Sequence, residues 1–125
     1  MLNSYDVIGN VKVDFPITVE LVDEVLSCAF EGGINYWVTG MVGVEKFAEG
    51  ATYASECVSR GKSVVIPFDK DDFANPPSNV LTVTKMVKGI QLYLNENPWS
   101  DLEDIDADIA DRIVQYALFD EVIYG

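Results

Sequence analysis

Carboxylates offer the clearest chemistry in this chain, and six of them fall within eleven residues close to its C-terminal end. Such a cluster can attract a basic protein surface, hold a cation or stabilise the start of a helix. Because the formal net charge of the chain is −13, the same surface repels nucleic acid and anionic membranes. The six acids are Asp101, Glu103, Asp104, Asp106, Asp108 and Asp111.

The negative charge is distributed unevenly along the chain. Residues 96–125 contain nine acids and a single base, Arg112, for a net charge of −8, whereas residues 1–95 have a net charge of −5. Like charges held close together destabilise a fold, but they accelerate the encounter with a basic partner. The asymmetry therefore favours a surface that docks a basic protein and could imitate the phosphates of a nucleic acid.

A local structural role for these acids is the competing interpretation. A helix is predicted to begin after Asp106, whose carboxylate would cap it, and to run to about Phe119. Asp108 would then lie in the first turn, where the helix dipole favours an anion by about 0.3–1 kcal/mol. Helical spacing predicts a narrow solvent-facing side made of Asp104, Asp108, Asp111 and Gln115.

Metal binding fits the acids poorly. Residues 104–108 alternate Asp as a calcium loop does, but Ile109 stands where that loop needs glycine and Gln115 where it needs glutamate. Asp69, Asp71 and Asp72 offer a second cluster that suits at most a weak divalent cation. With no histidine in the chain, we predict no metal site and no cofactor.

Enzymatic chemistry is not supported by any catalytic pattern. Without histidine, a general base would have to be a carboxylate or a lysine. The serines of Ser27-Cys28 and Ser59-Arg60 have no recognisable activating partner in the sequence. We predict a non-enzymatic protein with no catalytic residues.

Residues 31–37 (Glu-Gly-Gly-Ile-Asn-Tyr-Trp) form the most distinctive string outside the acidic segment, residues 101–111. One interpretation is a helix end that leads into a buried strand, with Trp37 as hydrophobic mass. The alternative is a small-molecule site, in which Asn35, Tyr36 and Trp37 contact a nucleotide-like ligand.

The order of the predicted helices and strands indicates an α+β fold, with one domain over residues 1–125. Helices are expected from Thr18 to a left-handed turn at Gly32-Gly33, over residues 84–95 and at 106–119, with one broken helix or two short ones at 44–60. Strands are expected at residues 7–15, 34–42, 63–68, 80–83 and 121–125, and a loop at 69–78. The expected architecture is a small mixed sheet of about four strands packed against three or four helices.

Neither export nor membrane insertion is indicated. The first residues lack the basic and apolar regions of a secretory signal. The longest uncharged stretch, residues 32–44, is too short to cross a bilayer as a helix. A cytoplasmic protein is expected, with Cys28 and Cys57 as free thiols.

Three strings support a resemblance that covers nearly the whole chain: residues 31–37, residues 53–61 and residues 105–119. The sequence resembles short acidic uncharacterised proteins encoded by phages and prophages of Gram-positive bacteria, and it departs from them in the loop Asn75-Pro76-Pro77-Ser78. The resemblance implies a setting in the host cytoplasm, where small acidic phage proteins often occupy host machinery such as defence nucleases.

These observations predict a protein that binds a basic host protein, such as a nucleic-acid-binding enzyme, and makes no direct contact with nucleic acid or membrane. The predicted contact residues are Asp101, Glu103, Asp104, Asp108 and Asp111. The alternative is the small-molecule site described above. A homodimer formed through an apolar two-fold interface is a third hypothesis.

Overall fold

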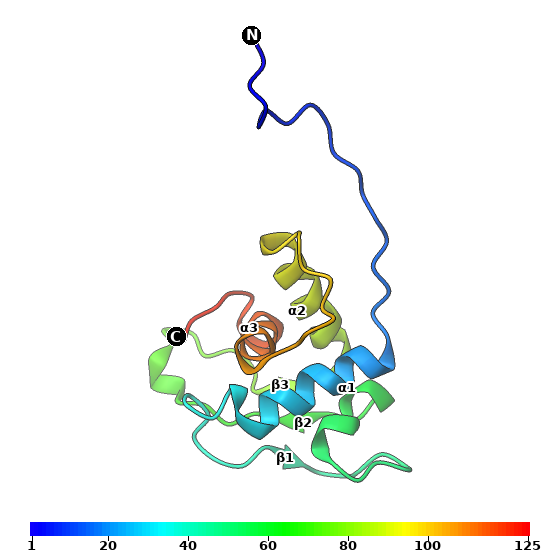
Figure 1. Ribbon diagram of the computed structural model, residues 1–125. Helices are drawn as coiled ribbons and strands as arrows, with labels where there is room; N and C mark the ends of the chain where they lie inside the picture. Colours follow the sequence, from blue (N-terminus) through cyan, green and yellow to red (C-terminus); the bar gives the residue numbers. More distant parts are fainter.

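The computed structural model describes residues 1–125 and has an α+β fold with three α-helices on one side of a small sheet (Figure 1). The helices are α1 (Val19–Cys28), α2 (Val83–Glu96) and α3 (Ala107–Phe119). The strands are β1 (Gly43–Val44), β2 (Val64–Val65) and β3 (Val80–Leu81), in the order β1-β2-β3. The α+β prediction is confirmed, with three antiparallel strands where about four in a mixed sheet were expected.

Four short helical turns complete the elements. A π-helical turn, η1 (Ala29–Gly33), extends α1, and the 3₁₀ turns are η2 (Ala54–Glu56), η3 (Val58–Arg60) and η4 (Lys70–Asp72). Over residues 44–60, where one broken helix or two short ones were expected, the helical elements are the two short 3₁₀ turns η2 and η3. The strands expected at 34–42 and 121–125 do not form, and residue 38 makes one isolated bridge to Phe68.

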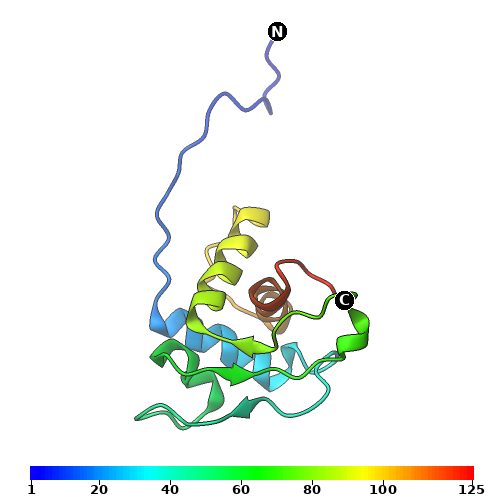
Figure 2. The ribbon, with the colours of Figure 1, turned by 180° about the vertical axis from the view of Figure 1, so that it is seen from behind.

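The first sixteen residues extend away from the folded body (Figure 2). Apolar side chains alternate along this segment as expected for a strand, but Val7, Val11 and Val13 are all exposed. A strand needs a neighbour for its backbone N–H and C=O groups, and no neighbouring strand pairs with this segment. The half-buried strand predicted over residues 7–15 is therefore absent.

Helix α1 begins as its sequence predicts. The Thr18 hydroxyl accepts a hydrogen bond from the backbone N–H of Leu21 at 3.1 Å, which satisfies one of the free donors of the first turn. Neither Gly32 nor Gly33 adopts the left-handed conformation that was expected. Gly33 is needed for a different reason, because a Cβ atom there would lie 2.7 Å from the carbonyl oxygen of Ala107.

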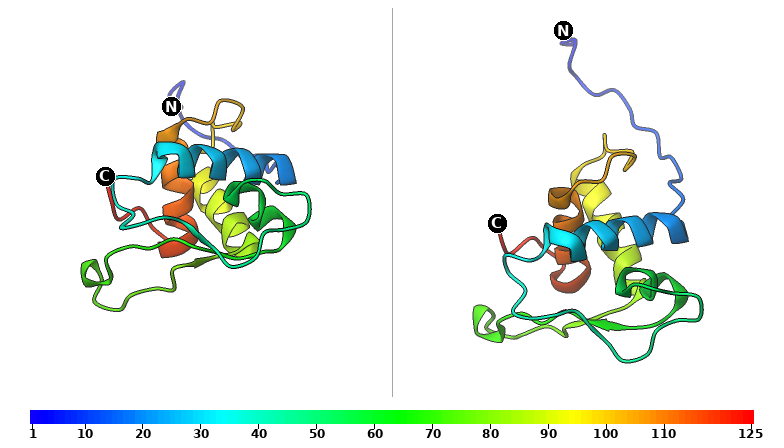
Figure 3. Two further views of the ribbon diagram at one scale, coloured as in Figure 1. Left: turned by 90° about the horizontal axis from the view of Figure 1, so that it is seen from below. Right: turned by 60° about the horizontal axis from the view of Figure 1, so that its bottom comes forward.

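Helix α3 is the centre of the fold. It packs beside α2 and crosses under α1, and the C-terminal segment runs back along its other side (Figure 3). Its contact with α2 is close enough that a Cβ atom on Gly89 would lie 2.6 Å from the carbonyl oxygen of Ile113. As a result, α3 is buried on nearly every side, with buried residues Ala110, Asp111, Ile113, Val114, Gln115, Ala117, Leu118 and Phe119.

An aromatic cluster closes the end of the core around the last turn of α3. The Phe119 ring lies 5.1 Å from that of Phe68 and 5.0 Å from that of Phe73, measured between centroids. Trp37 contacts Phe119 edge-on and stacks on Tyr124 at 5.2 Å. Because these rings come from four separate segments, they tie the loops and the C-terminal segment to α3.

Candidate functional site

Asp111 is buried, and the prediction that it belongs to a solvent-facing docking surface is wrong. It is 5% exposed, and its two carboxylate oxygens accept hydrogen bonds from three side chains. Tyr36 Oη donates at 2.6 Å, Trp37 Nε1 at 2.7 Å and Gln115 Nε2 at 2.9 Å. These donors replace the water that a carboxylate loses on burial, so Asp111 has a structural role.

Gln115 is likewise buried, although the helical spacing predicted that it would be exposed to solvent. Its Oε1 atom accepts hydrogen bonds from the backbone N–H groups of Ile123 and Tyr124, both at 2.8 Å. Its Nε2 atom donates to Asp111 and to the Tyr124 carbonyl oxygen. The Gln115 side chain therefore supplies the backbone hydrogen bonds that a neighbouring strand would otherwise give to the C-terminal segment.

The small-molecule hypothesis for residues 35–37 meets a physical obstacle. Trp37 is 6% exposed, and Tyr124 already covers a face of its ring, so that the indole is not available to stack on a ligand. The Tyr36 hydroxyl is occupied by Asp111, and partial burial followed by this hydrogen bond raises the pKa of Tyr36 to about 12. Asn35 lines an open pocket, which has a volume of about 370 Å³ and mostly apolar walls.

The other four predicted contact residues, Asp101, Glu103, Asp104 and Asp108, are exposed. Asp108 forms an ion pair with Arg112 at 3.2 Å. Asp101 accepts a hydrogen bond from the backbone N–H of Glu103. The side chains of Glu103 and Asp104 form no hydrogen bond or ion pair within the protein, so these two carboxylates are free to meet a partner.

Asp106 caps α3 as predicted. Its Oδ1 atom accepts a hydrogen bond from the backbone N–H of Ile109 at 2.8 Å, and Asp108 lies in the first turn beside it. Both positions complement the helix dipole, so the local structural interpretation is confirmed for these two acids.

Part of the acidic segment lies against α1. The Cys28 thiol lies 3.6 Å from the carbonyl oxygen of Ile105, which places the C-terminal end of α1 against the start of α3. Burial raises the pKa of this thiol, and the nearby carboxylates of Glu24, Glu31 and Asp106 raise it further. Carboxylates from two distant parts of the sequence, α1 with η1 and the start of α3, therefore lie near the Cys28 thiol.

The α1 acids were not among the predicted site residues, although the sequence contains their signal. Glu20, Glu24, Ser27 and Glu31 are spaced by four, three and four residues, which places them on one side of a helix. The apolar stripe of α1 identifies the opposite side as buried. What the spacing alone does not reveal is that Glu24 and Glu31 lie near the same thiol, Cys28, as Asp106 does.

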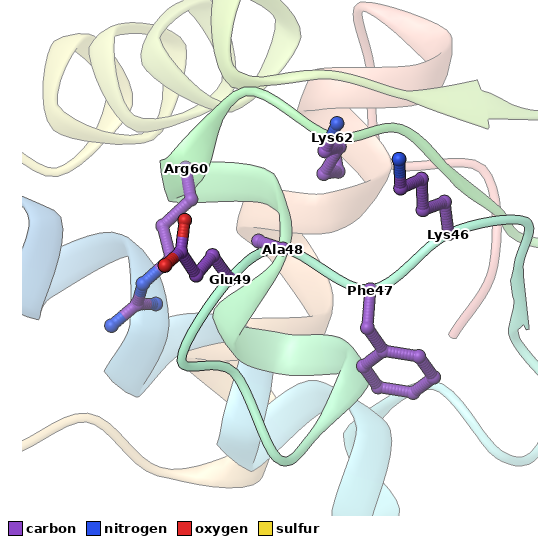
Figure 4. A pocket seen from close by; sticks show the side chains of 6 residues that line it. All are labelled: Lys46, Phe47, Ala48, Glu49, Arg60 and Lys62. Atoms are coloured by element: carbon purple, nitrogen blue, oxygen red, sulfur yellow. The ribbon is translucent and has the colours of Figure 1, made fainter.

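Positive charge is concentrated in one open pocket of about 620 Å³, where three of the eight basic residues lie (Figure 4). Lys46 and Lys62 point the same way on one side of Ala48, and neither forms an ion pair. Arg60 points away from them toward α1, where its Nη1 atom lies 3.4 Å from Asp23. This pocket is a local exception to the negative charge of the chain.

No group of three or more histidine, cysteine, aspartate or glutamate side chains is arranged to hold one metal ion. None of the helices combines the length and the apolar character that a membrane span requires. Comparison of this chain with protein-family models, with curated proteins and with solved structures gives no match.

Proposed function

We propose that this protein is a non-enzymatic, acidic phage protein that binds a basic surface of a host protein. The contact residues would be the exposed acids Asp101, Glu103, Asp104 and Asp108, without Asp111. The observation that carries the proposal is that Glu103 and Asp104 are exposed and have no partner inside the protein. Carboxylates that neither cap a helix nor pair with a base repel one another, and a basic partner would relieve this repulsion.

The proposed mechanism is competition for arginine and lysine side chains. A nucleic-acid-binding enzyme holds its substrate largely through contacts between these side chains and phosphates. An acidic surface that occupies them would exclude the nucleic acid, and long-range attraction would speed its binding. Acting in the cytoplasm of an infected cell, such a protein would inhibit a defence nuclease without any chemistry of its own.

Arg112 sets a limit on this surface. It pairs with Asp108, so that docking through Asp108 would have to compete with an ion pair that already exists. This pair is exposed and contributes at most about 1 kcal/mol, which a basic partner can replace. Glu103 and Asp104 require no such exchange, and we expect them to contribute more per residue than Asp108.

The test is a capture experiment on host lysate with two matched variants. The first variant neutralises the proposed surface with Asp101→Asn, Glu103→Gln, Asp104→Asn and Asp108→Asn. The control makes an identical change in charge elsewhere, with Asp14→Asn, Glu45→Gln, Glu49→Gln and Asp71→Asn, all at exposed positions.

We expect the wild type and the control to capture the same host protein at about 50 mM salt and to release it at about 500 mM, where screening is strong. The first variant should capture none of it, and duplex DNA should displace it from the wild type. Capture that is unchanged in the first variant, or that is insensitive to salt, would contradict the proposed function.

A further inference from the structure

The acidic side of α1 forms one wall of a groove. The opposite wall is the turn η2 with the residue that precedes it, Tyr53. Two adjoining cavities, of about 380 and 330 Å³, make up the groove and share Ser27, Tyr53 and Ser55. The acids that line it are Glu20, Asp23, Glu24, Glu31 and Glu56.

Ser55 identifies this groove as more than a group of surface acids. The residue is 8% exposed and lines both cavities, and its hydroxyl has no hydrogen-bond partner in the protein. Every fully enclosed side-chain nitrogen or oxygen in the molecule does have a partner, so the Ser55 hydroxyl oxygen is not fully enclosed. A nearly buried hydroxyl without a partner favours a ligand that can donate a hydrogen bond to it.

The carboxylates of the groove differ in how far they are already engaged. Asp23 accepts a hydrogen bond from Ser59 and pairs with Arg60. Glu56 accepts two backbone hydrogen bonds through its Oε1 atom, from Tyr53 and Thr52, and these bonds lower its pKa.

Glu20 and Glu24 have no internal partner and keep their full capacity to accept hydrogen bonds. The groove therefore presents two free carboxylates on one wall and a hydroxyl without an internal partner on the other.

We propose that this groove receives the guanidinium group of an arginine from a basic protein partner, an inference that rests on the proposed function. The acids are too far apart to ligate a single metal ion, whereas a planar guanidinium carries five N–H donors that can reach several acceptors at once. Tyr53, which is 68% exposed, and Phe30, which lines one of the two cavities, offer aromatic faces on which a guanidinium stacks well.

The position of the groove suits a partner that also touches the acidic segment. Glu24 and Glu31 lie close to Cys28, whose thiol contacts Ile105 in that segment. This contact joins α1, which forms one wall of the groove, to the segment that contains Glu103 and Asp104. In this arrangement the acidic segment attracts the partner and the groove fixes one arginine.

The experiment measures binding of acetyl-hexaarginine amide, with hexalysine and hexacitrulline peptides as comparisons. Two variants test the groove: Tyr53→Ala with Ser55→Ala, and Glu24→Gln alone, which is exposed and should not affect folding. The matched control is Tyr5→Ala with Ser4→Ala, in the extended N-terminal segment. Amide chemical shifts of residues 53–56 report where the peptide binds.

We expect each groove variant to bind hexaarginine about fivefold more weakly than the wild type and the control do, because a charged hydrogen bond is lost. Hexalysine should bind less tightly than hexaarginine and change little between variants, and hexacitrulline should not bind. Equal affinity of wild type and groove variants for hexaarginine, with shifts confined to residues 101–108, would overturn the groove while leaving the proposed function intact. No binding of either basic peptide at low salt would count against both.

Discussion

Asp108 and Asp111 lie less than one turn apart on α3, and they occupy opposite environments. The Asp108 side chain is 69% exposed and pairs with Arg112, whereas Asp111 is 5% exposed and accepts three hydrogen bonds, from Tyr36, Trp37 and Gln115. Two neighbouring carboxylates in the acidic segment therefore have different roles. Removing the first changes a surface, whereas removing the second opens the core.

The difference follows from what surrounds each position. The first turn of α3 faces solvent, and Asp108 needs only water and the helix dipole. One turn later, α1, the segment after η1 and the C-terminal residues all close around the helix. At that depth a carboxylate persists only if donors replace its hydration, and Tyr36, Trp37 and Gln115 supply them.

The largest expected effect comes from Asp111→Ala. This change leaves three donors without their acceptor and opens a small cavity, so the free energy of unfolding should fall by about 3 kcal/mol or more. The matched change Asp104→Ala removes an exposed carboxylate with no partner and should stay within about 0.5 kcal/mol of the wild type. Chemical denaturation monitored by circular dichroism measures both, and equal effects would erase the contrast between the two environments.

A smaller loss is expected from Gln115→Leu, which keeps side-chain bulk but leaves the N–H groups of Ile123 and Tyr124 without an acceptor. The free energy of unfolding should fall by about 1–3 kcal/mol. Hydrogen exchange at those two amides should accelerate more than exchange elsewhere in the protein. Gln91→Leu, at an exposed position on α2, is the control and should leave both amides protected.

The smallest effect concerns the Tyr36 hydroxyl in alkaline solution. Its pKa is raised from 10.0 to about 12, as is that of Tyr124, by burial first and then by hydrogen bonds to Asp111 and Asp72 respectively. Because folding favours the protonated phenols, their contribution to stability is complete below pH 10 and is lost as the pH rises from 10 to 12.

In Asp111→Asn the pKa of Tyr36 should move back toward 10, since the charged acceptor is gone. Ultraviolet absorbance at alkaline pH, compared with the Tyr36→Phe variant, follows this phenol. An unchanged titration would mean that Asp111 does not control Tyr36.

Those parts of the fold that depend on local signals could be predicted from the sequence. The Thr18 cap and the apolar stripe located α1, and the Asp106 cap located the start of α3. The stripe of α2 was likewise sufficient to place that helix within a residue or two of its bounds. Each of these signals involves residues within a few positions of one another.

Features that depend on distant contacts could not be predicted in the same way. Helical spacing correctly separated Asp111 and Gln115 from the apolar positions of α3, but it assigned that side to water. Because α3 is enclosed by several segments, its polar side is buried as well, and its partners lie more than seventy residues away at Tyr36 and Trp37. The same limit applies to residues 7–15, whose pattern suits a strand but which have no neighbour to pair with.

The placement of the two tryptophans makes light emission a convenient reporter on this molecule. Trp37 is enclosed and donates its indole N–H to Asp111, whereas Trp99 is 97% exposed. A neutral collisional quencher such as acrylamide reaches Trp99 freely and is kept from Trp37, so the fluorescence separates into two components. The emission that resists quenching comes from Trp37, so it reports, without any added label, whether the core around Asp111 stays closed.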